Sequence, residues 1–182
     1  MQLHNTYINA PDDAHGAVLA IGNFDGVHKG HQALLRAARE MAAADKAPFA
    51  AMTFEPHPRE FFQTEAPPFR LTLPSMKQRL LQDCGVEHLF ALPFNKELSQ
   101  VHAADFISDI LVRHLKIRRV VVGDGFAFGS KKSGSAAMLA SDARFATTAL
   151  KPVTDSDGVV ISSSRVREHL QKAEFAAAEK LL

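Results

Sequence analysis

Two histidines three residues apart, His28 and His31, follow a glycine-containing stretch of the chain. The residues before them, Leu19–Ile21, are apolar and typical of a buried strand, and strong helix formers occupy residues 33–44. A strand, a turn and a helix N-terminus in this order present free backbone N–H groups and the positive end of a helix dipole. Because such an end binds phosphate well, we expect a phosphate site at this turn, with both imidazoles at its mouth.

Other interpretations of the histidine pair stay open from the residues alone. A histidine near a helix N-terminus is commonly a structural residue that faces the core. A pair at i and i+3 also suits a metal, but zinc requires three or four ligands and the chain has one cysteine, Cys84. The stretch matches neither a Walker loop nor GxGxxG. The glycines around the pair, together with Asp25 and the preceding strand, favour phosphate binding.

A second anion-binding pattern lies near the end of the chain, at Ile161-Ser-Ser-Ser-Arg-Val-Arg167. A serine run caps a helix while its hydroxyl and N–H groups face an anion. Arg165 and Arg167 add guanidinium donors whose geometry matches phosphate oxygens. Alone, such a run is more often an ordinary solvated helix start. Together with the histidine turn, it predicts a second wall of one phosphate site.

These loops need a scaffold that brings them together, and the hydrophobic pattern predicts one. Continuous apolar runs are typical of strands in a parallel sheet and alternate here with helical patterns. Strands are expected at residues 17–21, 49–54, 87–92, 120–123 and 147–153, with a short one at 159–161. Helices are expected at residues 28–45, 73–85, 103–116 and 136–144, with two more marked by Val166, Leu170 and Ala173 and by Phe175, Ala178 and Leu182.

The segments between these elements are expected to be turns and loops. Residues up to about His15 are polar, and Pro56 and Pro58 predict a long loop reaching Phe69. The alternation of strands and helices indicates an α/β fold, a Rossmann-like doubly wound parallel sheet in a single domain. In such a sheet, ligands collect outside the carboxyl ends of the strands, where the two anion-binding loops would meet.

The composition is that of an ordinary globular domain, with 182 residues, 46% of them hydrophobic and 23% charged. A formal charge of +1 provides no general attraction for nucleic acid, so no nucleic-acid partner is expected. The first residues lack a basic and apolar leader pattern, and no run approaches eighteen apolar residues. We therefore expect a cytoplasmic protein without a membrane partner; the sequence leaves its oligomeric state open.

Four stretches together resemble a known family. His28-Lys-Gly-His31 matches the HxGH signature of the nucleotidyltransferase superfamily, and GNFDGVHKGH at residues 22–31 resembles the adenylyltransferase module of prokaryotic FAD synthetases. TFEPHP at 53–58, VGDGFAFG at 122–129 and ISSSRVR at 161–167 are similar to that family's TFxPHP, VGxxFxFG and ISSTxxR. The resemblance implies transfer of AMP from ATP to FMN, giving FAD and pyrophosphate, with Mg²⁺ required.

The resemblance also implies roles for individual residues. The catalytic groups are His28, His31 and Arg167, which hold the phosphates while the FMN phosphate attacks the α-phosphorus of ATP in line. The ATP-binding residues are Gly22, Asn23, Phe24, Asp25, Gly30, Ser163, Ser164 and Arg165. The FMN-binding residues are Pro56, His57, Pro58, Phe62, Asp124, Phe126 and Phe128. The ligands of the magnesium ion stay unassigned.

Two alternatives are kept beside this function. An adenylyltransferase for another phosphorylated acceptor, such as nicotinamide mononucleotide or phosphopantetheine, shares the HxGH signature. A flavin- or nucleotide-binding module without turnover is suggested by Gly125, where the family commonly has Asp or Asn, and by Ser135, where it often has Asp. Bifunctional members continue into a riboflavin kinase domain; we expect residues 1–182 to form the adenylyltransferase domain, with the kinase domain absent from this chain.

Overall fold

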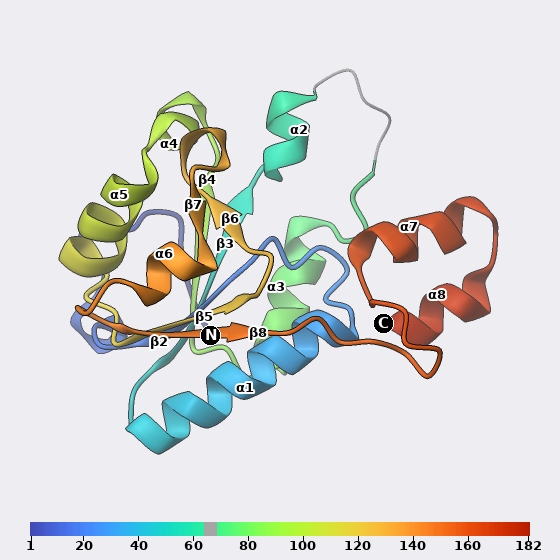
Figure 1. The fold of residues 1–182 in the computed structure, drawn as a ribbon, viewed down its shortest axis with the longest axis horizontal. Helices are drawn as coiled ribbons and strands as arrows, with labels where there is room; N and C mark the ends of the chain where they lie inside the picture. The colour runs from blue at the N-terminus through green and yellow to red at the C-terminus, as the bar shows by residue number, and fades with distance from the viewer. Residues whose placement is uncertain (64–68) are drawn as a thin grey trace.

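Six parallel strands form the central sheet of the computed structural model, which describes residues 1–63 and 69–182 (Figure 1). Their order is β1-β4-β3-β2-β5-β8, with β2 between β3 and β5. The strands are β1 (Gln2–His4), β2 (Val18–Ile21), β3 (Phe49–Glu55), β4 (His88–Pro93), β5 (Arg119–Gly123) and β8 (Ala146–Leu150). All four residues of β2 are buried, as expected of a strand covered on both faces.

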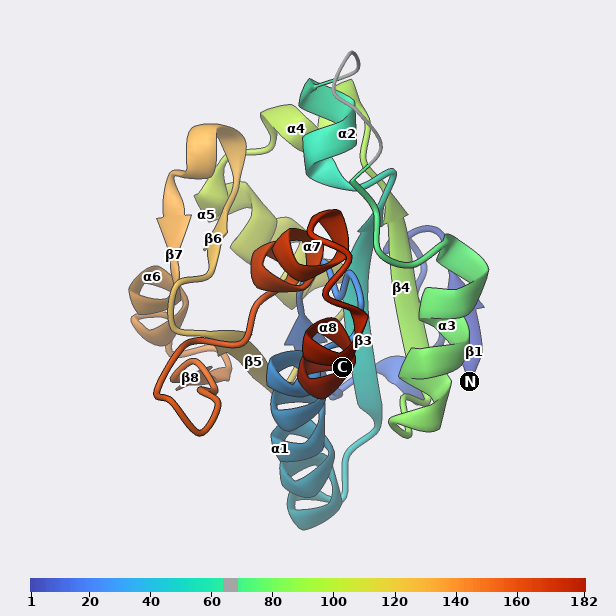
Figure 2. The same cartoon turned by 90° about the vertical axis from the view of Figure 1, so that its right-hand side faces the viewer.

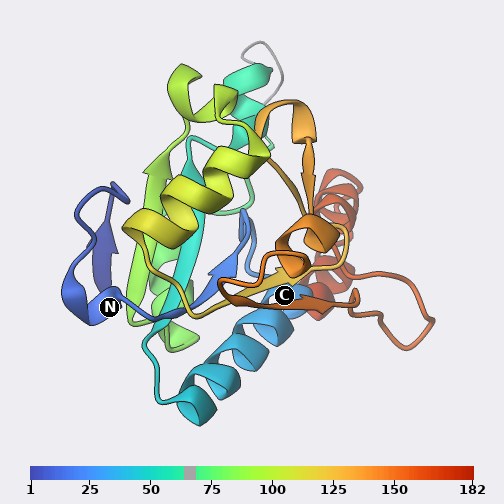
Figure 3. The ribbon, with the colours of Figure 1, turned by 60° about the vertical axis from the view of Figure 1, so that its left-hand side comes forward.

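Helices cover both faces of this sheet (Figures 1 and 3). Leu35 of α1 and Leu81 of α3 pack in one hydrophobic layer, and Ile110 and Leu111 of the π-helical segment η2 pack in the other. The helices are α1 (Lys29–Asp45), α2 (Pro58–Phe62), α3 (Pro74–Asp83), α4 (Lys96–Gln100), α5 (Ala103–Asp105) continuing into η2 (Phe106–His114), α6 (Ala136–Ala140), α7 (Ser163–Gln171) and α8 (Phe175–Leu181), with short 3-10 turns η1 (Asp12–Ala14) and η3 (Ser130–Lys132). The predicted α/β fold with a parallel sheet is confirmed.

The strand order places a topological switch at the centre of the sheet. From β2, the chain continues to β3 and β4 on one side, whereas β5 and β8 add on the other side. Ligands of such sheets bind at the carboxyl ends of the two strands that flank the switch, here β2 and β5. The paired helices α7 and α8 lie in front of this region in Figure 2, so the second anion-binding pattern is near it.

Several predicted elements were wrong. The polar N-terminal segment contains strand β1, which pairs with β4. The expected loop after β3 contains α2, because Pro58 occupies a first-turn position where no N–H is needed. Residues 159–161 do not join the sheet; they contribute one antiparallel bridge, Thr154 to Val160. The part of that expected loop at residues 64–68 lies outside the described residues.

Two smaller differences concern the later part of the chain. The loop after β5 forms an antiparallel hairpin of β6 (Ala127–Phe128) and β7 (Gly134–Ser135). Helix α6 ends at Ala140, four residues before the predicted end, and α4 was not predicted.

Candidate active site

A cavity of about 480 Å³ opens at the carboxyl ends of β2 and β5. Its lining comes from the turn after β2, the start of α1, the turn after β5 and the segment after β8: Ile21, Gly22, Phe24, His28, Gly30, His31, Ala33, Leu34, Ala37, Gly123, Asp124, Gly125, Phe126, Leu150, Lys151, Pro152, Val153 and Ile161. Of the residues predicted to bind ATP, Gly22, Phe24 and Gly30 line this cavity, together with both motif histidines. Its mostly apolar wall and few polar groups are typical of a small-molecule site.

The two histidines stand together at the N-terminus of α1. His28 is the N-cap, and its Nδ1 accepts a hydrogen bond from the backbone N–H of His31 at 3.3 Å. The rings stack with their centroids 3.7 Å apart, and Phe24 meets the His31 ring edge-on. Because Nδ1 of His28 accepts this bond, the ring proton is on Nε2, which is left to donate to a ligand.

Both imidazoles are neutral at pH 7. Burial, followed by the nearby Arg167 charge, lowers the pKa of His28 from 6.5 to about 4. Burial, followed by His28 and Lys77, lowers the pKa of His31 to about 3. The buried Nδ1 of His31 has no hydrogen-bond partner in the part of the chain that the structure describes. The pair therefore offers polar but uncharged groups at a helix N-terminus.

Gly30 allows α1 to begin close to the segment before α7. A Cβ at this position would lie 3.1 Å from the His28 ring and 3.3 Å from the Ile161 carbonyl oxygen. These separations are tighter than most side chains tolerate, and the second involves backbone that cannot easily move. Glycine is therefore needed for this close approach.

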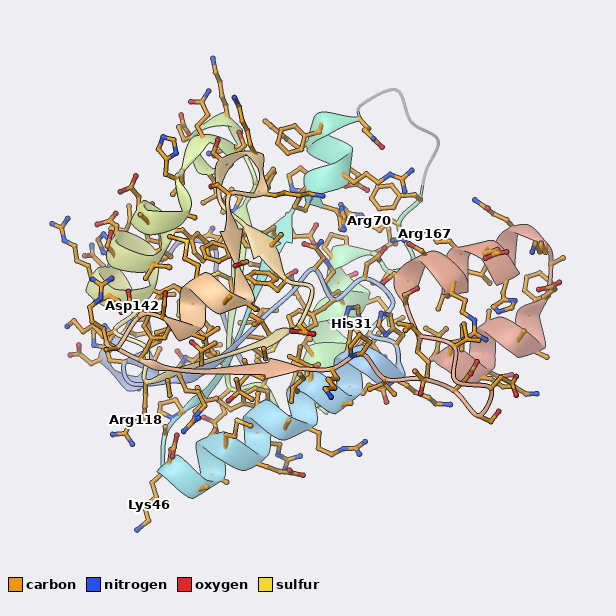
Figure 4. The ribbon with its side chains drawn as sticks, in the orientation of Figure 1. His31, Lys46, Arg70, Arg118, Asp142 and Arg167 are labelled. Atoms are coloured by element: carbon orange, nitrogen blue, oxygen red, sulfur yellow. The ribbon has the colours of Figure 1, made fainter. Side chains whose placement is uncertain are left out.

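Asp25 and Arg167 meet beside the cavity but do not line it. Arg167 Nη2 donates to Asp25 Oδ2 at 2.5 Å, and Arg167 Nε donates to the carbonyl oxygen of Phe69 at 2.6 Å. The guanidinium also lies over the Phe69 ring, 4.8 Å from its centroid. Figure 4 shows Arg167, on α7, on the same side of the molecule as His31. In the structure the carboxylate of Asp25, a residue predicted to bind ATP, accepts from Arg167 and from the backbone N–H of Leu71.

The serine run lies where it was predicted but uses its side chains differently. Ser163 Oγ donates to the backbone carbonyl of Asp25 at 2.8 Å, which ties α7 to the turn after β2. Ser164 is exposed, and neither it nor Ser163 lines the cavity. Arg165 forms an ion pair with Asp155 at 2.5 Å, so its guanidinium is engaged away from the cavity. Spacing alone cannot reveal such tertiary partners.

Four of the residues predicted on the flavin side, Pro56, His57, Pro58 and Phe62, lie in α2 or directly before it. His57 is the N-cap of α2 through its Nδ1, its ring meets Phe69 edge-on, and burial lowers its pKa. Pro56 is exposed, and Pro58 begins the helix. Phe62 is 66% exposed. This group forms a wall near Arg167, separate from the lining of the main cavity.

The loop after β5 contributes some side chains to the cavity and others to the hydrophobic core. Asp124 and Phe126, predicted on the flavin side, line the same cavity as the histidine pair. Phe128 is buried in the core against Phe106, so it is not available to a ligand in this structure. Asn23 also stays off the cavity lining, and its carbonyl oxygen accepts from Thr53.

Sequence reasoning missed an ionic cluster behind the flavin-side wall. Lys77 is 2% exposed and donates to Glu55 at 2.6 Å, while Arg70 pairs with the same carboxylate at 3.0 Å and with Glu60 of α2. The cluster joins β3, α2 and α3. A charged residue on the apolar side of a helical pattern, three and four residues before Leu80 and Leu81, was the available signal.

Comparison with known proteins agrees with this geometry. The sequence profile described as FAD synthetase matches residues 10–165. The bifunctional riboflavin kinase/FMN adenylyltransferase of Escherichia coli strain K12 is 40% identical over 99% of this chain and 57% of its own length. The protein of the same name from Haemophilus influenzae is 38% identical over 100% of this chain and 60% of its own length. The chain thus spans a little over half the length of these relatives.

A solved structure shares the fold. It is described as a macrolide-efflux protein from Streptococcus pneumoniae, with a TM-score of 0.84 and 29% identity over 98% of this chain and 58% of that one. Among residues 1–63 and 69–182 of the present chain, no helix has the length and apolar character needed to cross a membrane. The profile match extends over most of the sequence and includes the turn, the cavity and the start of α7. The chain belongs to the FAD synthetase family.

Proposed function

We propose that this chain transfers AMP from ATP to FMN, producing FAD and pyrophosphate. The observation that carries the proposal is the cavity at the β2–β5 switch, with two stacked neutral histidines at its helix N-terminus. The apolar side chains of Pro152 and Val153 after β8 suit the nucleoside, and the α1 N-terminus suits the phosphates. The amino-acid sequence identity with proteins named bifunctional riboflavin kinase/FMN adenylyltransferase supports FMN as the acceptor.

In this reaction an oxygen of the FMN phosphate attacks the α-phosphorus of ATP. The new P–O bond forms as the bond from the α-phosphorus to the oxygen bridging it to the β-phosphorus breaks, and that oxygen leaves with pyrophosphate. Positioning and charge stabilisation supply most of the catalysis of such transfers. His28 donates from Nε2 to a phosphate oxygen, and the His31 ring lies against the His28 ring. Arg167 stabilises the negative charge that develops on the departing pyrophosphate.

The proposed site assignments are adjusted to the geometry. Asp124 and Phe126 are assigned to the nucleotide cavity, because they line it. His57, Pro56, Pro58 and Phe62 remain the proposed flavin wall, at which Phe69 adds an aromatic face near Arg167.

Mg²⁺ is proposed to arrive with ATP as part of the substrate. In the described ranges no three His, Cys, Asp or Glu residues are grouped to hold a metal. Asp124 supplies one carboxylate at the cavity, and Mg²⁺ commonly uses one or two carboxylates together with substrate phosphates. We also propose that residues 1–182 form one adenylyltransferase domain acting in the cytoplasm, where ATP is available, with small molecules as its substrates; fractionation of cells tests the location.

Incubation of the chain with MgATP and FMN tests the activity. Chromatography should show FAD and pyrophosphate forming in equal amounts, and FAD should form at least about 100-fold more slowly when His28→Asn replaces the native chain under the same conditions. Parallel reactions with nicotinamide mononucleotide and phosphopantetheine test the other acceptors. Formation of one of those adenylylated products without FAD would overturn FMN as the acceptor, and flavin binding without pyrophosphate release would indicate a binding module.

A further inference from the structure

The Asp25 carboxylate joins three segments that are distant in sequence. It accepts hydrogen bonds from the backbone N–H groups of Leu71 and Thr72 at 3.0 and 3.1 Å and from the Thr72 hydroxyl at 3.3 Å. Its other oxygen accepts from Arg167 on α7. The side chain of Asp25 is 3% exposed. A buried carboxylate with this many donors is held in one orientation.

The contacts of Arg167 extend this connection toward the flavin-side wall. Its Nε binds the Phe69 carbonyl and its guanidinium covers the Phe69 ring, which in turn meets His57. Figure 4 shows Arg167 between the segment that carries Arg70 and the start of α1 that carries His31. The position of the guanidinium is therefore set by Asp25 on one side and by residue 69 on the other.

We propose that Asp25 is a positioning residue, which acts on the reaction through Arg167 and through the Leu71–Thr72 backbone rather than by touching ATP. Both oxygens of its carboxylate accept hydrogen bonds from protein donors. It holds Arg167 at the border between the nucleotide cavity and the flavin-side wall, and it holds the segment that leads from that wall into α3.

This proposal distinguishes Asp25 from a nucleotide ligand. A ligand of ATP would affect ATP binding directly, whereas a positioning residue affects the alignment of Arg167 and the order of residues 69–72. Removing the negative charge also releases Arg167 from its partner, while an asparagine side chain of nearly the same size preserves the packing. The kinetic part of the proposal rests on the proposed adenylyl transfer; the structural part does not.

The first test is hydrogen exchange of the substrate-free protein, which requires no activity. In Asp25→Asn, the amides of Leu71 and Thr72 should exchange faster by about tenfold or more, because an amide oxygen is a weaker acceptor than a carboxylate. In Asp142→Asn those amides should exchange as in the native chain. Asp142 pairs with Arg144 at the far side of the molecule, which makes this variant a matched loss of an Asp–Arg pair (Figure 4).

The second test is steady-state kinetics. Asp25→Asn should lower kcat on the order of 100-fold, the effect of displacing a catalytic group by about 1 Å, and leave ATP binding without FMN within about threefold. In an Arg167→Gln background, adding Asp25→Asn should change kcat by less than about threefold, because the two residues act as a unit. Asp142→Asn should keep the native kcat.

Three results would overturn the inference. Unchanged exchange at Leu71 and Thr72 in Asp25→Asn would remove its structural basis, whatever reaction the protein catalyses. Weakened ATP binding by about tenfold, or effects of Asp25→Asn and Arg167→Gln that multiply fully, would make Asp25 an independent ligand. If the native chain forms no FAD but Asp25→Asn still speeds exchange at Leu71 and Thr72, the proposed function is refuted. Asp25 would then keep only its structural role of positioning residues 69–72.

Discussion

Replacing His28 by asparagine separates its catalytic role from its structural one. His28 caps α1 through Nδ1, stacks on His31 with ring centroids 3.7 Å apart and lines the cavity, where its Nε2–H is the proposed donor to phosphate. Asparagine is a good N-cap, so it preserves the bond from His31 N–H, whereas alanine loses that bond at a cost of about 1 kcal/mol. Both variants lose the Nε2 donor. We therefore expect similar losses of activity but different losses of stability.

The size of the kinetic effect follows from the role of the donor. Removing one preorganised donor from developing negative charge lowers kcat by about 100- to 1,000-fold, or about 3–4 kcal/mol. FMN affinity should change little, because the proposed flavin wall around His57 is separate from His28 and the cavity lining. FAD formation at saturating MgATP and FMN gives kcat, and quenching of flavin fluorescence without ATP gives the affinity for FMN.

The outcome that refutes this reasoning is an equal fall in turnover and in FMN affinity in a folded His28→Asn protein. Circular dichroism and thermal unfolding establish that the variant is folded. The paired alanine variant is the control for the cap, since it should unfold at a lower temperature than the asparagine variant while having a similar kcat.

Three further predictions follow from the same geometry. Because the folded state lowers the pKa of His28 from 6.5 to about 4, the unfolded state binds more protons between these values. The contribution of His28 to the free energy of unfolding should therefore fall by about 1 kcal/mol from pH 7 to pH 5, after allowance for solvent screening. Urea titrations at the two pH values should show a correspondingly smaller fall in His28→Asn than in the native chain. Lys77→Met should lower the free energy of unfolding by about 1–3 kcal/mol. This loss is smaller than that caused by leaving a buried charge without any partner, because Glu55 still pairs with Arg70; an unchanged urea midpoint would contradict this. Asp155→Asn should raise KM for ATP more than it lowers kcat, because its ion pair with Arg165 holds the turn of residues 154–160, which lies between the cavity-lining Val153 and Ile161; a change confined to kcat would exclude this role.

The sheet and its main helices were predictable because each leaves a local pattern. Continuous apolar runs mark the central strands, and helical periodicity from residue 28 to 45 marks α1. The meeting of the two anion-binding loops followed from the rule for carboxyl ends of parallel strands. Strand β1 was missed because it is a three-residue edge strand with exposed residues, whose place depends on His4 packing against His88 and Phe90.

The side-chain roles at the site were less predictable than the positions. Arg165 and Arg167 are alike in the sequence, yet one pairs with Asp155 in a surface hairpin and the other with Asp25 beside the cavity. The choice depends on which acceptor the fold brings near each guanidinium, and those acceptors are far away along the chain. Phe128 likewise reads as a ligand contact in a motif but fills the core.

The pairing of β1 has a consequence for how the chain folds during synthesis. Among the strands in residues 1–63 and 69–182, β1 is synthesised before the others, whereas its partner in the sheet is β4, and the contacting residues His4 and His88 are 84 positions apart. At about 5–20 residues per second, β1 waits about 4–17 seconds before β4 is made. Strands β2 and β3 with α1 form much closer contacts in sequence, so they are available to nucleate the fold while the N-terminal residues are still unpaired.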